Sequence, residues 1–169
     1  MLFLQPLTRE SDIQRVVALE AASYPADEAA SDTKIRFRQQ QAGAFFAAAF
    51  VKETDNEAEL VGFVNGTLTT SQELTDESMS EHEPLGSTLC IHSVVIDAAH
   101  RRKGLASAML KQYVRDVIEQ QEQVVRIVLI AKAHLVSFYV NCGFAVTKLS
   151  TVVHGKDPWF ELVIDCVAA

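Results

Sequence analysis

Arg101-Arg102-Lys103-Gly104-Leu105-Ala106 is the stretch that decides the fold. It follows an apolar run, Cys90 to Ile96, that predicts a strand, and it precedes a run from Leu105 to Glu119 with the apolar spacing of a helix. The first amides of a helix have no partner inside it, so they can hold an anion. Three cations at that end are unfavourable, because the N-terminus is the positive end of the helix dipole. A bound anion would offset this effect. The layout predicts a pyrophosphate-binding turn, with a solvated basic turn as the alternative.

The composition indicates a globular protein with one domain, expected to span residues 1–169. Apolar residues make up 49% of the chain and charged residues 22%, which is ordinary for such a protein. The formal net charge of -7 argues against general affinity for nucleic acid or for an anionic membrane. It weakly favours a cationic partner such as an amine.

The cysteines and the start of the chain favour a cytoplasmic protein without a metal. Cys90, Cys142 and Cys166 include no CxxC pair, so neither a disulfide framework nor a structural zinc site is expected. The start, Met1 to Pro6, lacks the features of a secretory signal. The longest unbroken apolar run, Ala44 to Val51, is much shorter than the roughly 18 residues of a membrane span.

The hydrophobic pattern predicts an α/β fold. Strands are predicted at Leu2–Leu7, Phe45–Lys52, Leu60–Thr69, Thr88–Ile96, Val124–Ala131, Phe144–Val153 and Trp159–Val167. Helices are predicted from Ser11 or Asp12 to Ser23, and at Asp27–Gln41, Leu105–Glu119 and His134–Asn141. Alternation in the middle implies parallel pairing there, and the hairpins at both ends imply antiparallel neighbours. The acidic connection Thr70–Pro84, with one helical turn expected near its middle, is either functional or a solvated loop.

Two motifs resemble the signatures of the GCN5-related N-acetyltransferase (GNAT) superfamily. Arg101-x-x-Gly104-x-Ala106 matches Q/R-x-x-G-x-G/A at the expected junction of strand and helix. Phe138-Tyr139-x-x-x-Gly143-Phe144 resembles the second signature, F-Y-x-x-x-G-F. The resemblance implies a mixed, mostly antiparallel seven-stranded sheet with a parallel, splayed central pair, flanked by about four helices.

Further stretches are similar to the arylalkylamine (serotonin) N-acetyltransferases, one of them to non-vertebrate members. Glu73–Met79, Cys90–His92 and Leu135–Tyr139 are similar to the family in general. Tyr24–Ser31 is similar to a segment of its non-vertebrate members. The resemblance implies transfer of an acetyl group from acetyl-CoA to a small amine such as serotonin, tryptamine or phenylethylamine. Polyamines, peptide or protein amines, and a CoA-binding sensor without turnover remain open alternatives. A monomer or weak homodimer is expected.

The resemblance also implies where acetyl-CoA binds. It would lie between the fourth and fifth strands, along the backbone of Val94, Val95 and Ile96. Its pyrophosphate would meet the turn formed by Arg101, Arg102, Lys103, Gly104, Leu105, Ala106 and Ser107. Glycine at position 104 permits a sharp turn and a close phosphate.

The chemistry requires a base, because an alkyl ammonium has a pKa around 10. His92 on the central strand is the candidate, with a buried histidine bound to a backbone carbonyl as the alternative. Strand alternation would place His92 on one face with Cys90, Val94 and Ile96. Tyr139 matches the family's general acid for the leaving thiolate, with a core aromatic as the alternative.

Cys90 stands where similar vertebrate enzymes carry a second histidine, and a buried thiol is a poor base. Either His92 works alone through a chain of water molecules, or another group contributes. Glu28 is the candidate for that group, because an acidic residue in this segment borders the amine site in some relatives. The other histidines are expected outside the chemistry: His100, His134 and His154 exposed, and His82 near the entrance.

The amine pocket needs an apolar slot and a polar rim. The candidates for its aromatic walls are Phe37, Phe45, Phe46, Phe63 and Trp159. For each of them, a position in the hydrophobic core is the favoured alternative. The acidic residues around Asp27–Glu28 and Glu73–Glu77 would attract an ammonium group.

Overall fold

The computed structural model describes residues 1–166. Within them, strands form one mixed sheet in the order β1-β2-β3-β4-β5-β7-β6. The strands are β1 (Leu2–Pro6), β2 (Phe46–Val51), β3 (Glu59–Thr69), β4 (Thr88–Ile96), β5 (Arg126–Lys132), β6 (Ala145–Leu149) and β7 (Trp159–Asp165). The α-helices are α1 (Glu10–Ser23), α2 (Asp32–Gln41), α3 (Leu105–Gln120) and α4 (Val136–Asn141). The β4–β5 pair is parallel, and the other neighbouring strands of this order pair antiparallel, which confirms the predicted fold class.

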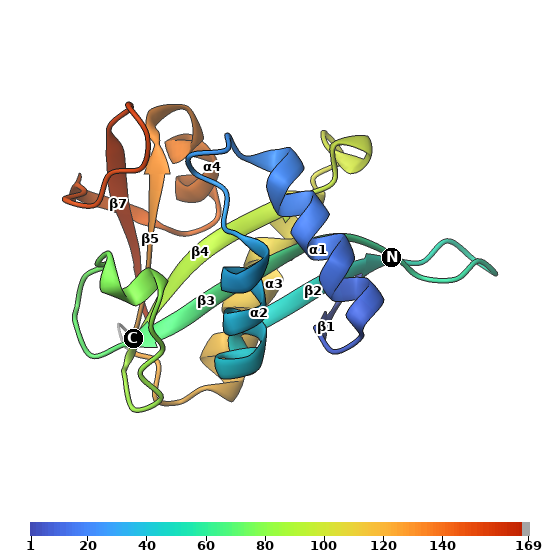
Figure 1. Cartoon of the computed structure of the whole chain (residues 1–169), viewed down its shortest axis with the longest axis horizontal. Helices are drawn as coiled ribbons and strands as arrows, with labels where there is room; N and C mark the ends of the chain where they lie inside the picture. The colour runs from blue at the N-terminus through green and yellow to red at the C-terminus, as the bar shows by residue number, and fades with distance from the viewer. Residues whose placement is uncertain (167–169) are drawn as a thin grey trace.

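Helices cover both faces of this sheet (Figure 1). One core lies between the sheet and the α1–α2 pair, with Val16 and Ile35 fully buried in it. The other lies under α3 and α4, where Leu110 and Tyr139 pack on the opposite face. No helix in the described part of the chain has the length and apolar character needed to cross a bilayer.

The predicted starts of two helices are wrong for local reasons. Helix α1 begins at Glu10 with Arg9 as its N-cap, so neither Ser11 nor Asp12 caps it. Helix α2 begins at Asp32 instead of Asp27, because the Ser31 side chain accepts the Lys34 amide and fixes the start there.

The strand predicted from Phe144 to Val153 is shorter, since β6 covers only Ala145–Leu149. The last strand, β7, ends at Asp165, and the predicted end at Val167 lies outside the described residues. The helical turn expected in the acidic connection is present as a 3₁₀ turn at Glu77–Met79.

The two central strands diverge soon after they pair. The parallel ladder joins only Thr88–Cys90 of β4 to Arg126–Val128 of β5. Beyond these residues the strands separate, as Figure 1 shows. Their inner backbone groups therefore need partners other than each other. This opening between β4 and β5 is the splay that the resemblance implied.

A bulge interrupts β4 at His92. Asn65 and Gly66 are consecutive in β3, yet they pair with Ser93 and Ile91, so His92 has no partner of its own across the ladder. Gly66 lets the strands approach closely there, because a Cβ on it would lie 2.6 Å from the Cys90 carbonyl oxygen. Bulges re-aim side chains and are frequent next to active sites.

The bulge contradicts the prediction that Cys90, His92, Val94 and Ile96 share one face. Cys90 packs in a small cluster with Val128. Val94 and Ile96 instead pack into the core under α3. The bulge adds one residue to β4 and so shifts the alternation of its side chains. Cys90, before the bulge, therefore points to the opposite face of the sheet from Val94 and Ile96, after it.

Candidate functional site

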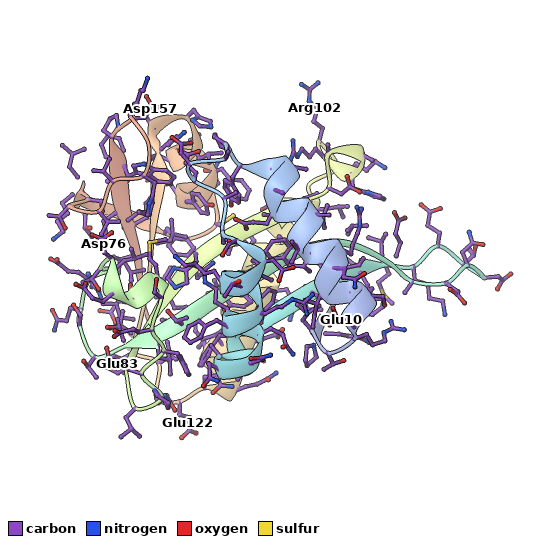
Figure 2. The ribbon with its side chains drawn as sticks, in the orientation of Figure 1. Glu10, Asp76, Glu83, Arg102, Glu122 and Asp157 are labelled. Atoms are coloured by element: carbon purple, nitrogen blue, oxygen red, sulfur yellow. The ribbon has the colours of Figure 1, made fainter. Side chains whose placement is uncertain are left out.

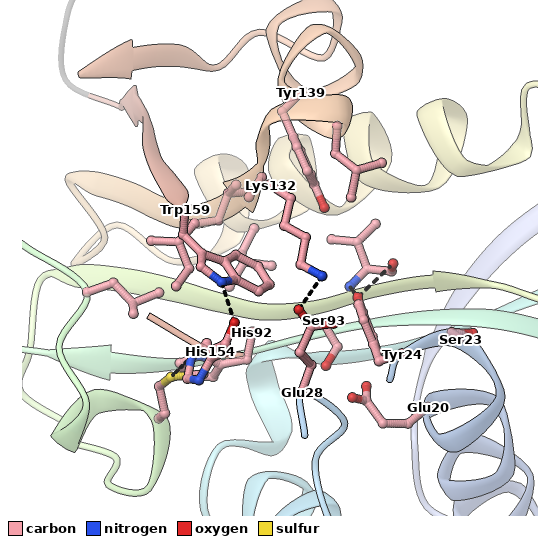
Figure 3. Close-up of a pocket in the computed structure, with 18 of the residues that line it drawn as sticks. Glu20, Ser23, Tyr24, Glu28, His92, Ser93, Lys132, Tyr139, His154 and Trp159 are labelled. Carbon is pink, nitrogen blue, oxygen red and sulfur yellow. Dashed lines mark hydrogen bonds and ion pairs between the residues drawn. The ribbon is translucent and has the colours of Figure 1, made fainter. Parts of the chain in front are cut away.

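A cavity of about 290 Å³ lies at the opening between β4 and β5 (Figure 3). Ile91–Val94 line it from β4 and Leu129–Lys132 line it from β5. The remaining walls come from the α1–α2 connection, from α4, and from the segments around Met79 and His154. The three side chains predicted to be catalytic, His92, Tyr139 and Glu28, all line this one cavity.

Hydrogen bonds to His92 determine which of its nitrogens carries the proton. The Thr67 hydroxyl oxygen lies 2.7 Å from His92 Nε2 and 2.5 Å from the Ser78 carbonyl oxygen. A carbonyl only accepts, so the single hydroxyl proton goes to Ser78 and Thr67 accepts from Nε2. In neutral His92 the proton is therefore on Nε2. Nδ1 keeps its lone pair and has no hydrogen-bond partner among the described residues.

His92 is also held in its neutral form. Burial lowers its pKa well below the ordinary value of 6.5, and the nearby Arg38 guanidinium acts in the same direction. A ring that is neutral at physiological pH can accept a proton on Nδ1 without first losing one. The alternative of a histidine bound to a backbone carbonyl is met in part, because the Ser78 carbonyl acts on the ring beside the Thr67 hydroxyl and opposes the lowering of the His92 pKa.

Tyr139 presents a protonated phenol to the cavity. Its ring packs edge-on against Phe138 and Phe144, with centroids 5.0 and 6.0 Å apart. Burial raises the pKa of this phenol far above its usual value, so the hydroxyl keeps its proton at neutral pH. Figure 3 shows the hydroxyl directed into the cavity.

Glu28 forms an ion pair with a lysine that the sequence analysis did not single out. The Glu28 side chain is 5% exposed, and its carboxylate lies 2.5 Å from Lys132 Nζ. Lys132 Nζ is also 3.6 Å from Asp157 and 5.6 Å from the centroid of the Trp159 ring. Its hydrogen bond with Glu28 raises the pKa of Lys132. An ammonium group therefore lies inside the cavity, between carboxylates and the face of an indole (Figure 3).

Tyr24, also missed, bridges the backbone of β4 at the opening. Its hydroxyl donates to the Val94 carbonyl oxygen at 3.3 Å, and the Val94 amide donates back to the hydroxyl at 3.4 Å. The peptide groups of Val94 therefore face the opening and hydrogen-bond to a side chain where an added strand would bind. The Ile96 carbonyl accepts from Arg101 Nε at 3.2 Å, and Val95 is buried.

Two buried charges lie beside the cavity and were not predicted either. Glu20 is 2% exposed; its Oε2 accepts the Ala30 amide at 3.0 Å, and burial raises its pKa. Arg38 is 1% exposed and donates to the Met79 carbonyl at 3.2 Å. Burial lowers the pKa of Arg38 to about 10, so it remains a cation at neutral pH. Helical periodicity had placed these residues on helices without indicating their inward side chains.

The turn before α3 has the backbone shape of an anion-binding turn. Arg102 and Gly104 both have left-handed conformations, with φ of 64° and 73°. Gly104 is the N-cap of α3, and a Cβ on it would meet no atom within 4 Å. Glycine is thus favoured there by its conformation and not by crowding within the protein.

The first amides of α3 point out of the helix end. The earliest hydrogen bond into the helix backbone is from the Ala108 amide to the Gly104 carbonyl, and no side chain caps the start. The amides of Leu105, Ala106 and Ser107 precede that bond. Lys103 and Arg102 are exposed, and Figure 2 shows Arg102 projecting away from the body.

The structure corrects the expectations for three histidines. His154 is not exposed; it lines the cavity, 3.1 Å from the Met79 sulfur through Nε2. His82 is not among the lining residues of the cavity. Its Nδ1 accepts a hydrogen bond from the Leu68 amide at 3.0 Å, which holds the ring against β3. His100 is half-buried, between Asp97 and Glu59. Only His134 is exposed as expected, at the cavity rim.

Of the five aromatic candidates, Trp159 alone is among the cavity-lining residues of the described chain. Phe45, Phe46 and Phe63 are buried in the cores, as the favoured alternative predicted. The acidic Glu73 pairs with Lys148 outside the cavity. Cys90 is fully buried, and burial raises its thiol pKa to about 12, which excludes it as a base at neutral pH.

Comparison with known proteins gives the same family as the two motifs. The family model of the acetyltransferase (GNAT) domain matches residues 34–157. The serotonin N-acetyltransferase of Mesocricetus auratus is 33% identical over 106 residues, which are 63% of this chain and 51% of that enzyme. The match thus spans about half the length of this relative.

Solved structures of low sequence identity share the fold. The loading GNATL domain of CurA from Lyngbya majuscula superposes with a TM-score of 0.80 at 15% identity, covering 98% of both chains. NAA60 of Arabidopsis thaliana in complex with acetyl-CoA gives 0.75 at 14% identity, covering 98% of this chain and 99% of that one. Identities this low show the fold alone.

Proposed function

This chain belongs to the GNAT acetyltransferase family, and we propose that it transfers the acetyl group of acetyl-CoA to a small primary amine of the arylalkylamine class. One observation carries the proposal. A neutral histidine with a free lone pair, a protonated tyrosine and a buried carboxylate line one cavity at the opening between β4 and β5. These are His92, Tyr139 and Glu28.

The opening and the turn before α3 fit acetyl-CoA. The pantetheine arm would pair with the outward-facing peptide groups of Val94, displacing the Tyr24 hydroxyl, and would run along Val95 and Ile96. The diphosphate would accept from the amides of Leu105, Ala106 and Ser107, and from the Arg101–Gly104 turn. An anion there would also offset the placement of three cations at the positive end of the α3 dipole.

Two side chains transfer protons, and a third holds the substrate. His92 accepts a proton from the amine on Nδ1, directly or through a water molecule, while Thr67 keeps the other nitrogen protonated. Tyr139 donates its proton to the thiolate that leaves. Glu28 holds the incoming ammonium in the cavity by charge. Because His92 and Tyr139 act on different protons, loss of either group slows the reaction without abolishing it.

The cavity walls support an arylalkylamine as the acceptor. Trp159 and Met79 give an apolar slot, and Glu28 gives a negative group at one end. A volume of about 290 Å³ is near the lower end for small-molecule pockets. The relatives named serotonin N-acetyltransferases support the same class, although the match covers half of their length.

A panel of amines tests this proposal through release of free CoA thiol. Tryptamine, serotonin and phenylethylamine are expected to be acetylated with higher kcat/KM than spermidine or a peptide N-terminus. The reason is that the cavity offers an aromatic wall, Trp159, beside the carboxylate of Glu28, which already pairs with Lys132. Release with spermidine or peptides alone would remove the arylalkylamine class. Binding of acetyl-CoA without release on any amine would leave only a CoA-binding sensor.

A further inference from the structure

Lys132 is a primary amine inside the cavity of a proposed amine acetyltransferase, and the proposed reaction assigns it no step. Its side chain is 20% exposed, and its Nζ is held by Glu28. The contacts of this ammonium, a buried carboxylate and an indole face, are those expected for the ammonium of an arylalkylamine. Lys132 therefore occupies the position of the acceptor.

Lys132 and Val94 line the cavity from the two strands that border the opening. The parallel ladder ends at Cys90 and Val128, and both strands continue along the cavity. Val94 lines it from β4, with its peptide groups facing the opening, and Lys132 lines it from β5. The strands have diverged by then, and the long lysine side chain reaches into the space between them (Figure 3).

From this placement we infer that Lys132 is a self-acetylation site, at which the chain transfers the acetyl group of its own bound acetyl-CoA to the Lys132 amine. The inference rests on the proposed function. The Lys132 ammonium gives a proton to Glu28, and its nitrogen attacks the thioester carbonyl. The new bond joins nitrogen to the acetyl carbon, and the bond between that carbon and sulfur breaks. Nitrogen loses two protons in all: Glu28 takes the first and passes it to solvent, and the leaving thiolate takes the second.

Self-acetylation would change the charge of the acceptor site. Acetyl-Lys132 is neutral, so Glu28 would lose the cation that now lies 2.5 Å from it. A carboxylate that is 5% exposed and unpaired attracts an external ammonium more strongly than a paired one does. The modification therefore removes an internal competitor of the amine substrate.

Lys148 provides a matched control within the same chain. It pairs with the carboxylate of Glu73, and this pairing raises the pKa of Lys148 as the Glu28 pairing raises that of Lys132. Lys148 is 40% exposed, twice the value for Lys132, and does not line the cavity. Acetylation by simple encounter with acetyl-CoA in solution would therefore favour Lys148, and only delivery from the bound thioester would favour Lys132.

The test is peptide mapping by mass spectrometry of the intact chain after incubation with acetyl-CoA and no amine. Label on Lys132 is expected to accumulate at least about tenfold faster than on Lys148, because a bound thioester raises the effective concentration at that nitrogen. The rate constant at saturating acetyl-CoA is expected to be unchanged when the protein is diluted. Labelling of Lys132 no faster than of Lys148, or a rate proportional to protein concentration, overturns the inference.

The same samples given tryptamine separate this inference from the proposed function. Thiol release with the amine, but no preference for Lys132, overturns self-acetylation and leaves the transferase proposal standing. Preferential Lys132 labelling, with no release on any amine of the panel, supports self-acetylation and overturns transfer to small amines. If neither Lys132 labelling nor thiol release is observed, both proposals are overturned.

Discussion

Replacing His92 with alanine is expected to lower kcat/KM for the amine by about 10²–10⁴-fold, the usual range for loss of a general base. His92 Nδ1 has no hydrogen-bond partner among the described residues, and the Thr67 hydroxyl holds the proton on the other nitrogen. No other lining histidine has both burial and a fixed tautomer of this kind among the described residues. Steady-state kinetics with a good amine, together with acetyl-CoA affinity, measure the effect.

His134→Ala is the matched control for His92, because His134 is exposed at the rim of the same cavity. It is expected to leave kcat close to that of the unaltered chain. The pH profile adds an independent readout. The base must be unprotonated, and the lowered pKa of His92 keeps it so at acid pH, so the acid limb of kcat should lie below pH 6.5. An unchanged kcat in His92→Ala, or an acid limb above that pH, would show that another group is the base.

Replacing Tyr139 with phenylalanine is the second large expected effect, a fall in kcat of about 10²-fold or more. The substitution keeps the ring that packs against Phe138 and Phe144 and removes only the hydroxyl. The thiolate must then take its proton from water, so the loss should appear in kcat more than in the KM of either substrate. Stability measured by thermal unfolding should change little.

Tyr113 allows a direct comparison of two buried tyrosines. Its hydroxyl donates to the Phe45 carbonyl at 2.7 Å, away from the cavity, and burial raises its pKa as well. Tyr113→Phe is expected to cost about 0.5–1.5 kcal/mol of stability through that lost hydrogen bond, with kcat retained. If Tyr139→Phe and Tyr113→Phe reduced kcat equally, the phenol of Tyr139 would have no specific role.

Local patterns were sufficient to predict most strands and helices and the turn before α3. The apolar β4, the glycine turn and the amphipathic α3 are adjacent in sequence, so their arrangement follows from short-range rules. The placement of His92, Tyr139 and Glu28 in one cavity was predicted because the resemblance supplied what periodicity cannot, the contacts between distant segments.

The errors have physical causes that short patterns do not record. The bulge at His92 arises from pairing with β3, including the close approach at Gly66, and it reversed the expected faces of β4. The Glu28–Lys132 pair joins residues that are far apart in the chain. Helix α2 begins later than the sequence pattern predicted, because the Ser31 side chain caps it. This cap outweighs the weak helix propensities of the preceding residues.

Calorimetric titration with acetyl-CoA and with acetyl-pantetheine, which lacks the diphosphate and nucleotide, tests the central claim most directly. The amides that open α3 are expected to hold the diphosphate, and hydrogen bonds to a charged group are each worth about 1.5–3 kcal/mol. The account predicts one acetyl-CoA bound per chain, at least about tenfold more tightly than acetyl-pantetheine. No heat with acetyl-CoA, or equal affinity for the two thioesters, would contradict it.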